Sequence, residues 1–244
     1  MSDSLAAGRC AVVTGATSAI GSALCRGLAQ AGMTLCLLGR DTDRLARLAA
    51  SLGPAAGRCL PGAVDLADEA SIETLAANLA RDPGAVDLLI HAAGEFDMGP
   101  HNSAPLAALD TLYRTNVRGP YQLTQALLPM LRAARGQIAF INSSAGLESK
   151  AGTGQYGATQ HALRAIAETL RAEVNADGVR VLNVYLGRTA SDRQARIFAR
   201  EGLPYSPELL MQPADVAAMA LAALRLPRTA EVTEIRMRPL LKSY

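Results

Sequence analysis

The sequence predicts one α/β domain built on a doubly wound parallel sheet with helices on both faces. Short apolar runs alternate with longer segments whose apolar residues recur at helical spacing, and this alternation continues along the whole chain. Such a pattern implies parallel strands joined by right-handed crossovers. Half of the 244 residues are hydrophobic, which is enough for a sizeable core. No linker, repeat or low-complexity stretch interrupts the chain, so we expect a single domain over residues 1–244.

In the first half of the chain, each expected strand is a short apolar run that ends in a glycine or polar turn. Each expected helix has an apolar stripe, and the second helix is bounded by Asp41, a suitable N-cap, and by Gly53-Pro54. The strands are expected at 9–14, 32–38, 58–64 and 86–90, and the helices at 22–31, 41–52 and 69–80.

The second half repeats this alternation with longer helices. Gly119-Pro120 is expected to break one helical region into two. Ser206-Pro207 has the N-cap and first-turn proline of a further helix start. The strands are expected at 136–142, 179–185 and 231–237, and the helices at 106–116, 121–135, 156–175 and 213–226.

Residues 189–212 differ from the segments around them. They are polar and carry Arg193, Arg196 and Arg200 among glycine and proline residues, which is typical of a mobile lid over a substrate cleft. The arginines could attract an anionic substrate, but a solvated surface is the simpler interpretation.

The composition argues against several classes of function. The formal net charge is +2 and the charges are spread along the chain, which disfavours a nucleic-acid partner. We find no signal peptide and no apolar run long enough to span a membrane, so we expect a cytoplasmic protein that acts on a small molecule. The cysteines lack CxxC spacing and are expected to be buried thiols, with no metal site. They are Cys10, Cys25, Cys36 and Cys59.

The segment from Thr14 to Gly21 links the first strand to the first helix. Glycines there let the backbone approach a ligand closely, and a helix N-terminus offers N–H groups to a phosphate, so we expect a dinucleotide site. At the end of the second strand, Gly39 lies where NAD-binding units carry an acidic residue, and Arg40 follows it. This favours NADP(H) over NAD(H). The alternative is a solvated Arg40 that caps the strand.

Small and polar residues recur just past the expected strands. The carboxyl ends of parallel strands meet at one edge of a sheet, so these residues should line one ligand site. Among them, His91 is expected to pack near the cofactor and not to catalyse. The residues at such ends are Gly15, Arg40, Asp65, His91, Ser143 and Gly187.

Ser143 precedes Tyr156 by thirteen residues, and Tyr156 opens the longest expected helix. Gln160 lies one turn further along the same helix face. A serine hydroxyl and a phenol that converge could polarise a carbonyl group and transfer a proton to it. Asn116 lies in a helical pattern that disfavours asparagine, and it is expected to bond to a neighbouring group.

These motifs follow the order found in the short-chain dehydrogenase/reductase family, which the chain resembles over essentially its whole length. The Gly-rich turn is similar to TGxxxGxG with Ala19 in place of the middle glycine. An NxAG motif is present with its asparagine replaced by His91, and a PG turn with its proline replaced by Leu186. The resemblance implies a Rossmann-type fold and a homodimer or homotetramer paired through helices 106–135 and 156–175.

The resemblance also implies site residues. Ser143, Tyr156 and Asn116 match three members of the family's catalytic tetrad, and Gln160 stands in place of the lysine of YxxxK. The cofactor-binding residues that it implies are Gly15, Thr17, Ser18, Ile20, Gly21, Arg40, Asp65, Leu66, Ala92, Ala93, Gly94, Tyr156, Gln160, Gly187 and Thr189.

Gln160 is the main departure from the family. The family's lysine holds the nicotinamide ribose and lowers the pKa of the tyrosine, whereas glutamine can donate a hydrogen bond but brings no charge. Oxidation of an alcohol needs the phenolate and reduction of a carbonyl needs the protonated phenol, so the change should weaken both and oxidation more. Lys150 or Arg188 could supply a replacement charge from nearby loops, while His161 faces another side of the helix.

We therefore expect an NADP(H)-dependent oxidoreductase that reduces a carbonyl group in a ketone, aldehyde or β-ketoacyl substrate. Tyr156 would donate the proton, Ser143 would orient the oxygen, Asn116 would support the site and Gln160 would hold the ribose. Two alternatives stay open. One is a redox-impaired protein that binds nucleotide as a sensor or scaffold subunit, and the other uses Tyr156 for non-redox acid–base chemistry.

Overall fold

Seven parallel strands form the sheet at the centre of the molecule. The computed structural model describes residues 5–241, and its strands lie in the order β3-β2-β1-β4-β5-β6-β7. The crossover from β3 to β4 reverses the direction of winding, which puts the topological switch point between β1 and β4. The predicted doubly wound sheet is confirmed. The strands are β1 (Cys10–Thr14), β2 (Thr34–Gly39), β3 (Arg58–Ala63), β4 (Leu88–His91), β5 (Gln137–Ser143), β6 (Arg180–Leu186) and β7 (Glu234–Met237).

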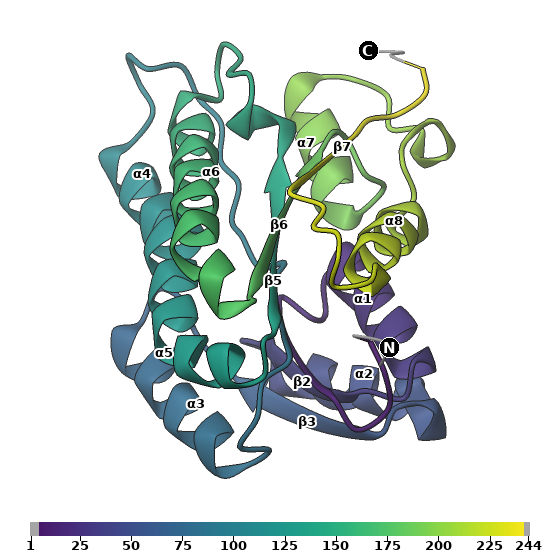
Figure 1. Ribbon diagram of the computed structural model, residues 1–244. Coiled ribbons are helices and arrows are strands. Elements are labelled where there is room, and N and C mark those ends of the chain that lie inside the picture. Colours follow the sequence, from purple (N-terminus) through teal and green to yellow (C-terminus); the bar gives the residue numbers. More distant parts are fainter. Residues whose placement is uncertain (1–4, 242–244) are drawn as a thin grey trace.

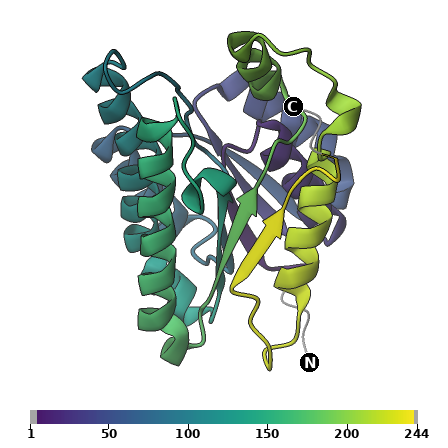
Figure 2. The ribbon, with the colours of Figure 1, turned by 90° about the horizontal axis from the view of Figure 1, so that it is seen from above.

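Helices cover both faces of this sheet. Helices α3 to α6 lie on one face, and α1, α2 and α8 lie on the other (Figures 1 and 2). The helices are α1 (Ala19–Gln30), α2 (Thr42–Leu52), α3 (Glu69–Arg81), α4 (Leu106–Tyr113), α5 (Gly119–Ala133), α6 (Gly154–Val174), α7 (Asp192–Glu201) and α8 (Pro213–Arg225).

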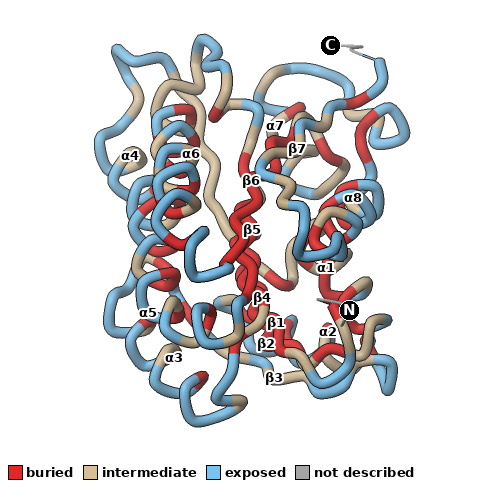
Figure 3. Tube along the Cα trace, in the orientation of Figure 1, coloured by how far each residue is buried: buried red, intermediate tan, exposed pale blue. Residues whose placement is uncertain are grey.

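The buried core has two layers, one on each face of the sheet. Val13 and Leu35 belong to the layer under α1, α2 and α8, whereas Val12 and Cys36 belong to the layer under α3, α5 and α6. Adjacent residues of a strand point to opposite faces, so a strand covered on both sides must be apolar throughout. This is why the strands read as continuous apolar runs, and Figure 3 shows them buried in the middle of the molecule.

The helical region around Gly119-Pro120 differs from the prediction. No break occurs there, because a π-helical turn over Arg114–Arg118 joins α4 to α5. The backbone N–H of Gly119 bonds to the carbonyl oxygen of Arg114, five residues back, so the hydrogen-bond register shifts where Pro120 lacks a donor. Gly119 itself serves packing, since a Cβ there would lie 2.3 Å from the carbonyl oxygen of Leu66.

The helix predicted to start at Ser206 is wrong. Only the short 3₁₀ turn Pro207–Leu209 forms, and the Ser206 side chain does not cap it. The chain then becomes extended, and Met211 pairs with Thr189 as an isolated parallel bridge. Burial of Met211 in the layer under α1 and α8 therefore takes precedence over the local helix-start signal.

Within residues 5–241, no helix is both long and apolar enough to cross a membrane. The same part of the chain contains no cluster of three histidine, cysteine or acidic side chains that could hold a metal ion. The four cysteines are free thiols, and all but the half-buried Cys59 are buried.

Candidate functional site

The turn between β1 and α1 has a shape that glycine allows and other residues do not. Gly15 has a φ of +61°, and a Cβ there would lie 2.8 Å from the carbonyl oxygen of Ala92, just past β4. A Cβ on Gly21 would lie 2.2 Å from the carbonyl oxygen of Gly15. Both distances are shorter than van der Waals contact, so a side chain at either position would force the turn apart. Ala19, which replaces a family glycine, is accommodated as the first residue of α1.

The N-terminus of α1 lies at this turn. The helix begins at Ala19, earlier than the predicted residue 22, and Ser18 is its N-cap. The Ser18 hydroxyl oxygen accepts a hydrogen bond from the backbone N–H of Gly21 at 3.0 Å. The N–H groups of the first helical turn, including that of Ile20, have no partner inside the helix and carry its positive dipole end, which suits a phosphate.

Thr14 connects β1 to the segment after β4. Its buried hydroxyl oxygen accepts hydrogen bonds from the backbone N–H groups of Ala92 at 3.1 Å and Ala93 at 3.2 Å. This clasp holds the predicted cofactor residues of the two strands side by side. Thr14 begins the predicted Gly-rich motif, but its bonds to the segment after β4 had no signal in the sequence, because they join segments far apart in the chain.

Two arginines that follow the end of β2 lie near the Gly-rich turn, which joins β1 to α1. Nη2 of Arg40 lies 2.8 Å from Oε1 of Glu95 in the loop after β4. Arg44, in the first turn of α2, donates from Nη2 to the carbonyl oxygen of Thr17 at 3.1 Å. The Arg40 side chain is 70% exposed, so it can turn toward an anionic ligand. Arg44 is a candidate that the sequence motifs missed.

The two predicted cofactor contacts after β3 differ in their surroundings. Leu66 is buried in the layer under α3 and α5. Asp65 is exposed, and its carboxylate accepts a hydrogen bond from the backbone N–H of Ala67 at 2.9 Å. Asp65 therefore shapes the turn that leads into α3.

Ser143 and Tyr156 come together at the carboxyl end of the sheet. Ser143 ends β5, Tyr156 lies in the first turn of α6, and their hydroxyl groups share a hydrogen bond. The ring of Phe96 meets the Tyr156 ring edge-on, with centroids 4.9 Å apart. Burial raises the pKa of Tyr156 above its usual value, while the bond with Ser143 and the positive charge of Arg193 act in the opposite direction. The phenol is therefore protonated at neutral pH and able to act as an acid.

Asn116 lies in the π-helical turn and bonds to the loop after β4. Its Nδ2 donates to the carbonyl oxygen of Glu95 at 2.9 Å, and its Oδ1 accepts from the N–H of Glu95 at 2.7 Å. Nδ2 also lies 3.2 Å from the Thr159 hydroxyl, to which Nε2 of the buried Gln160 donates at 3.3 Å. Gln160 thus sits one turn past Tyr156 in a network of uncharged groups. Thr159, which joins Asn116 to Gln160, had no signal in the sequence.

His91 packs inside the protein at the end of β4. Its Nε2 lies 2.8 Å from the hydroxyl of Thr124 in α5, and its ring stacks on Phe140 with centroids 4.8 Å apart. Burial lowers the pKa of His91 to about 3, so the ring is neutral near pH 7. The packing interpretation therefore holds for the side chain.

The two cations that the sequence suggested as replacements, Arg188 and Lys150, lie in different surroundings. Arg188 forms an ion pair with Glu201 at 2.7 Å and its guanidinium lies over the Phe198 ring, 4.4 Å from the centroid. Lys150 is exposed. The charge that lowers the pKa of Tyr156 comes instead from Arg193 in α7.

The segment predicted as a lid, residues 189–212, contains α7 and contacts the loop after β4. Arg200 forms an ion pair with Asp97 at 2.8 Å and donates to the carbonyl oxygen of Met98 at 2.8 Å. At the base of the segment, the hydroxyl of the buried Thr189 donates to the carbonyl oxygen of Gly187 at 3.3 Å. The two predicted cofactor residues after β6 therefore lie in one tight turn.

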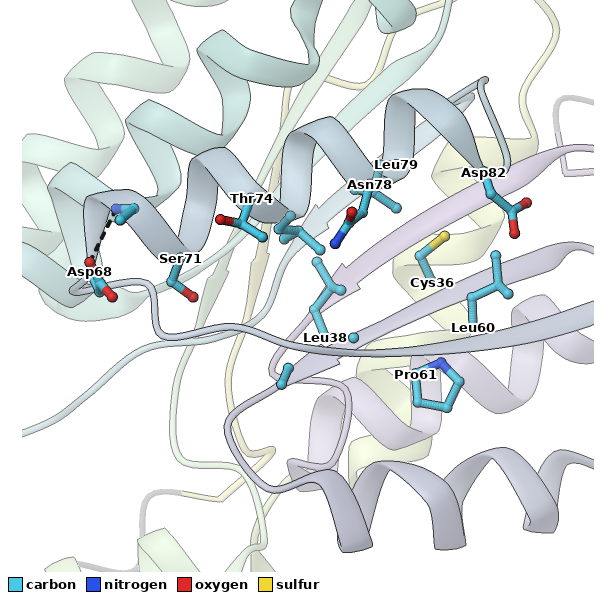
Figure 4. A pocket seen from close by; sticks show the side chains of 14 residues that line it. Cys36, Leu38, Leu60, Pro61, Asp68, Ser71, Thr74, Asn78, Leu79 and Asp82 are labelled. Atoms are coloured by element: carbon cyan, nitrogen blue, oxygen red, sulfur yellow. Dashed lines mark hydrogen bonds between the residues drawn. The ribbon is translucent and has the colours of Figure 1, made fainter.

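A hollow of about 590 Å³ lies elsewhere, between α3 and the β2–β3 edge of the sheet. Figure 4 shows polar side chains of α3, such as Ser71 and Thr74, on one side of it, and Leu38, Leu60 and Pro61 on the other. Neither Ser143 nor Tyr156 lines this hollow, and it is separate from the candidate site.

Comparison with known proteins gives one family and close structural neighbours. A family model described as short chain dehydrogenase matches residues 9–202. A probable NADP-dependent dehydrogenase of Haemophilus influenzae is 31% identical, covering 96% of this chain and 94% of that protein. The NADP-dependent 3-hydroxy acid dehydrogenase YdfG of Escherichia coli O6:H1 is 29% identical and covers 96% of both chains.

Solved structures agree with these sequence matches. An alcohol dehydrogenase from the archaeon Thermococcus sibiricus, complexed with 5-hydroxy-NADP, superposes with a TM-score of 0.86 at 25% identity, covering 97% of this chain and 98% of that one. A short chain dehydrogenase from Shigella flexneri, complexed with NADP, superposes with a TM-score of 0.87 at 26% identity, covering 96% of this chain and 98% of that one.

Proposed function

The chain belongs to the short-chain dehydrogenase family, and from this premise we propose that it is an NADP(H)-dependent oxidoreductase that reduces a carbonyl group to an alcohol. The observation that carries the proposal is the hydrogen-bonded pair of Ser143 and Tyr156, at the same sheet edge as the Gly-rich turn. Relatives named as NADP-dependent and neighbours solved with NADP support the choice of cofactor. The proposed substrates are ketones, aldehydes or β-ketoacyl compounds.

The residues at this edge fit a dinucleotide with an additional phosphate. The space that Gly15 and Gly21 leave, together with the N-terminus of α1, suits a pyrophosphate. Arg40 and Arg44 supply positive charge beside the turn, which suits the 2′-phosphate that distinguishes NADP(H) from NAD(H). Gln160 would donate a hydrogen bond to a ribose hydroxyl in place of the family's lysine.

Proton transfer is the part of the reaction that the side chains perform. When bound, NADPH supplies the hydride for the carbonyl carbon. Tyr156 donates its proton to the carbonyl oxygen, and Ser143 orients and stabilises that oxygen by a hydrogen bond. Asn116 holds the backbone of Glu95, and so keeps Phe96 against the Tyr156 ring. Asn116 is therefore a positioning residue.

The favoured direction follows from the charge that is missing at Gln160. A buried amide leaves the phenol of Tyr156 without the family's nearby ammonium group, and burial raises the phenol pKa. The acid form that reduction needs is then abundant, while the phenolate that oxidation needs is scarce. We propose that carbonyl reduction is the working direction.

Gln160 also supports a second candidate function. Its amide is engaged with Thr159, as expected of a structural residue in a nucleotide-binding sensor or scaffold subunit without redox activity. A site that uses Tyr156 for non-redox acid–base chemistry is consistent with the same geometry. The retained pairing of Ser143 with Tyr156 weighs against a pure binding role, because binding a nucleotide needs neither hydroxyl.

We further propose that the protein forms a homodimer or homotetramer through α4, α5 and α6. Large apolar side chains stand exposed on α4 and α5, including Leu106 at 78%, Tyr113 at 52% and Tyr121 at 53%. Exposed apolar residues that gather on neighbouring helices commonly mark an interface, and a two-fold axis would pair the same face of two copies.

The experiment that tests the function measures NADPH oxidation with a panel of ketones, aldehydes and β-ketoacyl thioesters, on the protein and on Gln160→Lys in parallel. Turnover by the unmodified protein supports a reductase that works without the lysine. Turnover by Gln160→Lys alone means that the fold and pocket are intact but that redox chemistry is not the natural task, which favours the binding or non-redox candidates.

A further inference from the structure

Arginines of the segment 189–212 differ in what they contact. Arg200 is neutralised by Asp97, and Arg188, which directly precedes the segment, is neutralised by Glu201. Arg193, in the first turn of α7, donates from Nη2 to the backbone carbonyl oxygen of Gly94. Figure 2 shows the segment that holds α7 above the carboxyl end of β6. Arg193 reaches from this segment to Gly94, in the loop after β4.

The positive charge of Arg193 is not compensated. Within residues 5–241, no carboxylate lies within ion-pair distance of it. The acidic side chains of the loop that it contacts are engaged elsewhere, since Glu95 pairs with Arg40 and Asp97 pairs with Arg200. A backbone carbonyl is a weak partner for a guanidinium compared with a carboxylate, which two parallel N–H groups can bind.

This charge lies at the reaction site. Gly94 is adjacent to Glu95, which Asn116 holds, and Phe96 of the same loop contacts the Tyr156 ring. The positive charge of Arg193 also lowers the pKa of the Tyr156 phenol. A substrate whose carbonyl oxygen meets Tyr156 would therefore have the guanidinium nearby.

We infer that Arg193 is a specificity-determining residue that binds the carboxylate of an oxo-acid substrate. This inference rests on the proposed carbonyl reduction. The carboxylate would replace the Gly94 carbonyl as the partner of Arg193 and would turn the carbonyl group of the same molecule toward Ser143 and Tyr156. A neutral ketone of the same size would lack this anchor and bind more weakly.

The reaction is oxo acid plus NADPH plus H⁺ giving hydroxy acid plus NADP⁺. The carbonyl π bond breaks, the carbon gains a C–H bond from the hydride, and the oxygen takes the proton of Tyr156, which is regained from water. The carbonyl carbon is reduced, NADPH is oxidised, and the carboxylate is unchanged.

The test compares 2-oxo, 3-oxo and 4-oxo pentanoates with their methyl esters, measured as kcat/KM for NADPH oxidation. We expect the protein to prefer at least one acid over its ester. Arg193→Gln should lower kcat/KM for that acid about tenfold to a hundredfold, through KM, and leave the ester unchanged. Arg193→Lys should retain part of the preference because it keeps the charge. Arg196→Gln is the matched control and should change neither, because Arg196 is an exposed arginine of the same helix, as Arg193 is, but only Arg193 contacts Gly94.

Equal loss for acid and ester in Arg193→Gln would overturn the inference, since it would mean that Arg193 acts only on the phenol or on the lid. Equal use of acid and ester by the unmodified protein would also overturn it. If no compound is reduced, the proposed function fails, and calorimetric binding of the acids to the NADP⁺-saturated protein decides. Binding lost in Arg193→Gln but kept in Arg196→Gln upholds the inference, and binding that is absent or unaffected overturns it.

Discussion

The turn region around β1 and β4 differs in kind from the proposed catalytic region around β5 and α6. In the turn region, backbone geometry determines what can bind, because Gly15 and Gly21 have no room for a side chain and Thr14 bonds to two backbone N–H groups. In the proposed catalytic region, the chemistry depends on the proton affinity of the Tyr156 side chain and on the charge at position 160, where Gln160 is neutral. The first region keeps the close backbone approaches at Gly15 and Gly21, while the second has the uncharged Gln160 where the family has a lysine.

This difference separates two questions about the molecule. Backbone geometry decides whether a dinucleotide can bind, and the charge next to the phenol decides in which direction and how fast protons move. Variants in the turn region should therefore change affinity, whereas variants in the catalytic region should change turnover or its pH dependence.

The largest expected effect is that of Tyr156→Phe. The ring would still pack against Phe96, but the proton donor would be gone, so kcat for carbonyl reduction should fall about 10²–10⁴-fold. The affinity for NADPH, measured by its fluorescence, should stay unchanged. Tyr113→Phe, an exposed tyrosine in α4, is the control and should keep full turnover. Substantial turnover in Tyr156→Phe would show that another group donates the proton.

A second prediction concerns Gly15→Ala. The positive φ and the contact of the new Cβ with Ala92 together should cost on the order of 1–3 kcal/mol, which corresponds to a loss of NADPH affinity of about tenfold to a hundredfold. The matched control is Gly53→Ala, where φ is +59° but nothing lies within 4 Å of the added Cβ. That variant should lose stability without losing affinity. If both variants bind NADPH normally, the close approach at Gly15 has no role in binding.

The third prediction is a change in pH dependence in Gln160→Lys. A cation within about 4–6 Å of the phenol should lower the pKa of Tyr156 by roughly 1–3 units. Alcohol oxidation, which needs the phenolate, should then begin at lower pH, and reduction, which needs the protonated phenol, should decline at lower pH. Near neutral pH, the ratio of kcat for alcohol oxidation to kcat for carbonyl reduction should rise about tenfold or more. Gln160→Met removes the amide without adding charge, and it should leave both pH profiles in place.

Much of this molecule could be predicted from the sequence, because its signals are local. Buried parallel strands must be apolar on both faces, so the order of elements followed directly from the pattern. The failures lie where distant contacts take precedence over local signals. Gly119 suggested a helix break but serves packing against Leu66, and Ser206-Pro207 suggested a helix start that the buried Met211 prevents.

The candidate site shows the same limit. The positions of Ser143 and Tyr156 were evident from their spacing and the strand ends, but the side chains that support them were not. Thr159 and Phe96 touch the site through the fold alone. Arg193 stood out in the sequence only as one of several arginines in a polar segment, and its contact with Gly94 bridges elements that are far apart in the chain.

The smallest expected effect concerns Arg40 and Arg44, the two arginines near the Gly-rich turn. Arg40→Ala and Arg44→Ala should each weaken NADPH binding by about threefold to tenfold, because exposed charges are screened by solvent. Arg47→Ala, one turn further along α2, is the control. NADH affinity distinguishes two explanations, since it stays constant if the arginines bind the 2′-phosphate and falls if Arg44 mainly holds the Thr17 carbonyl. The loss for NADPH should also shrink at high salt. If the affinities for NADPH and NADH both fell, and fell equally at low and high salt, these arginines would serve to hold the backbone of the turn. The 2′-phosphate of NADP(H) would then have no charged partner in this region.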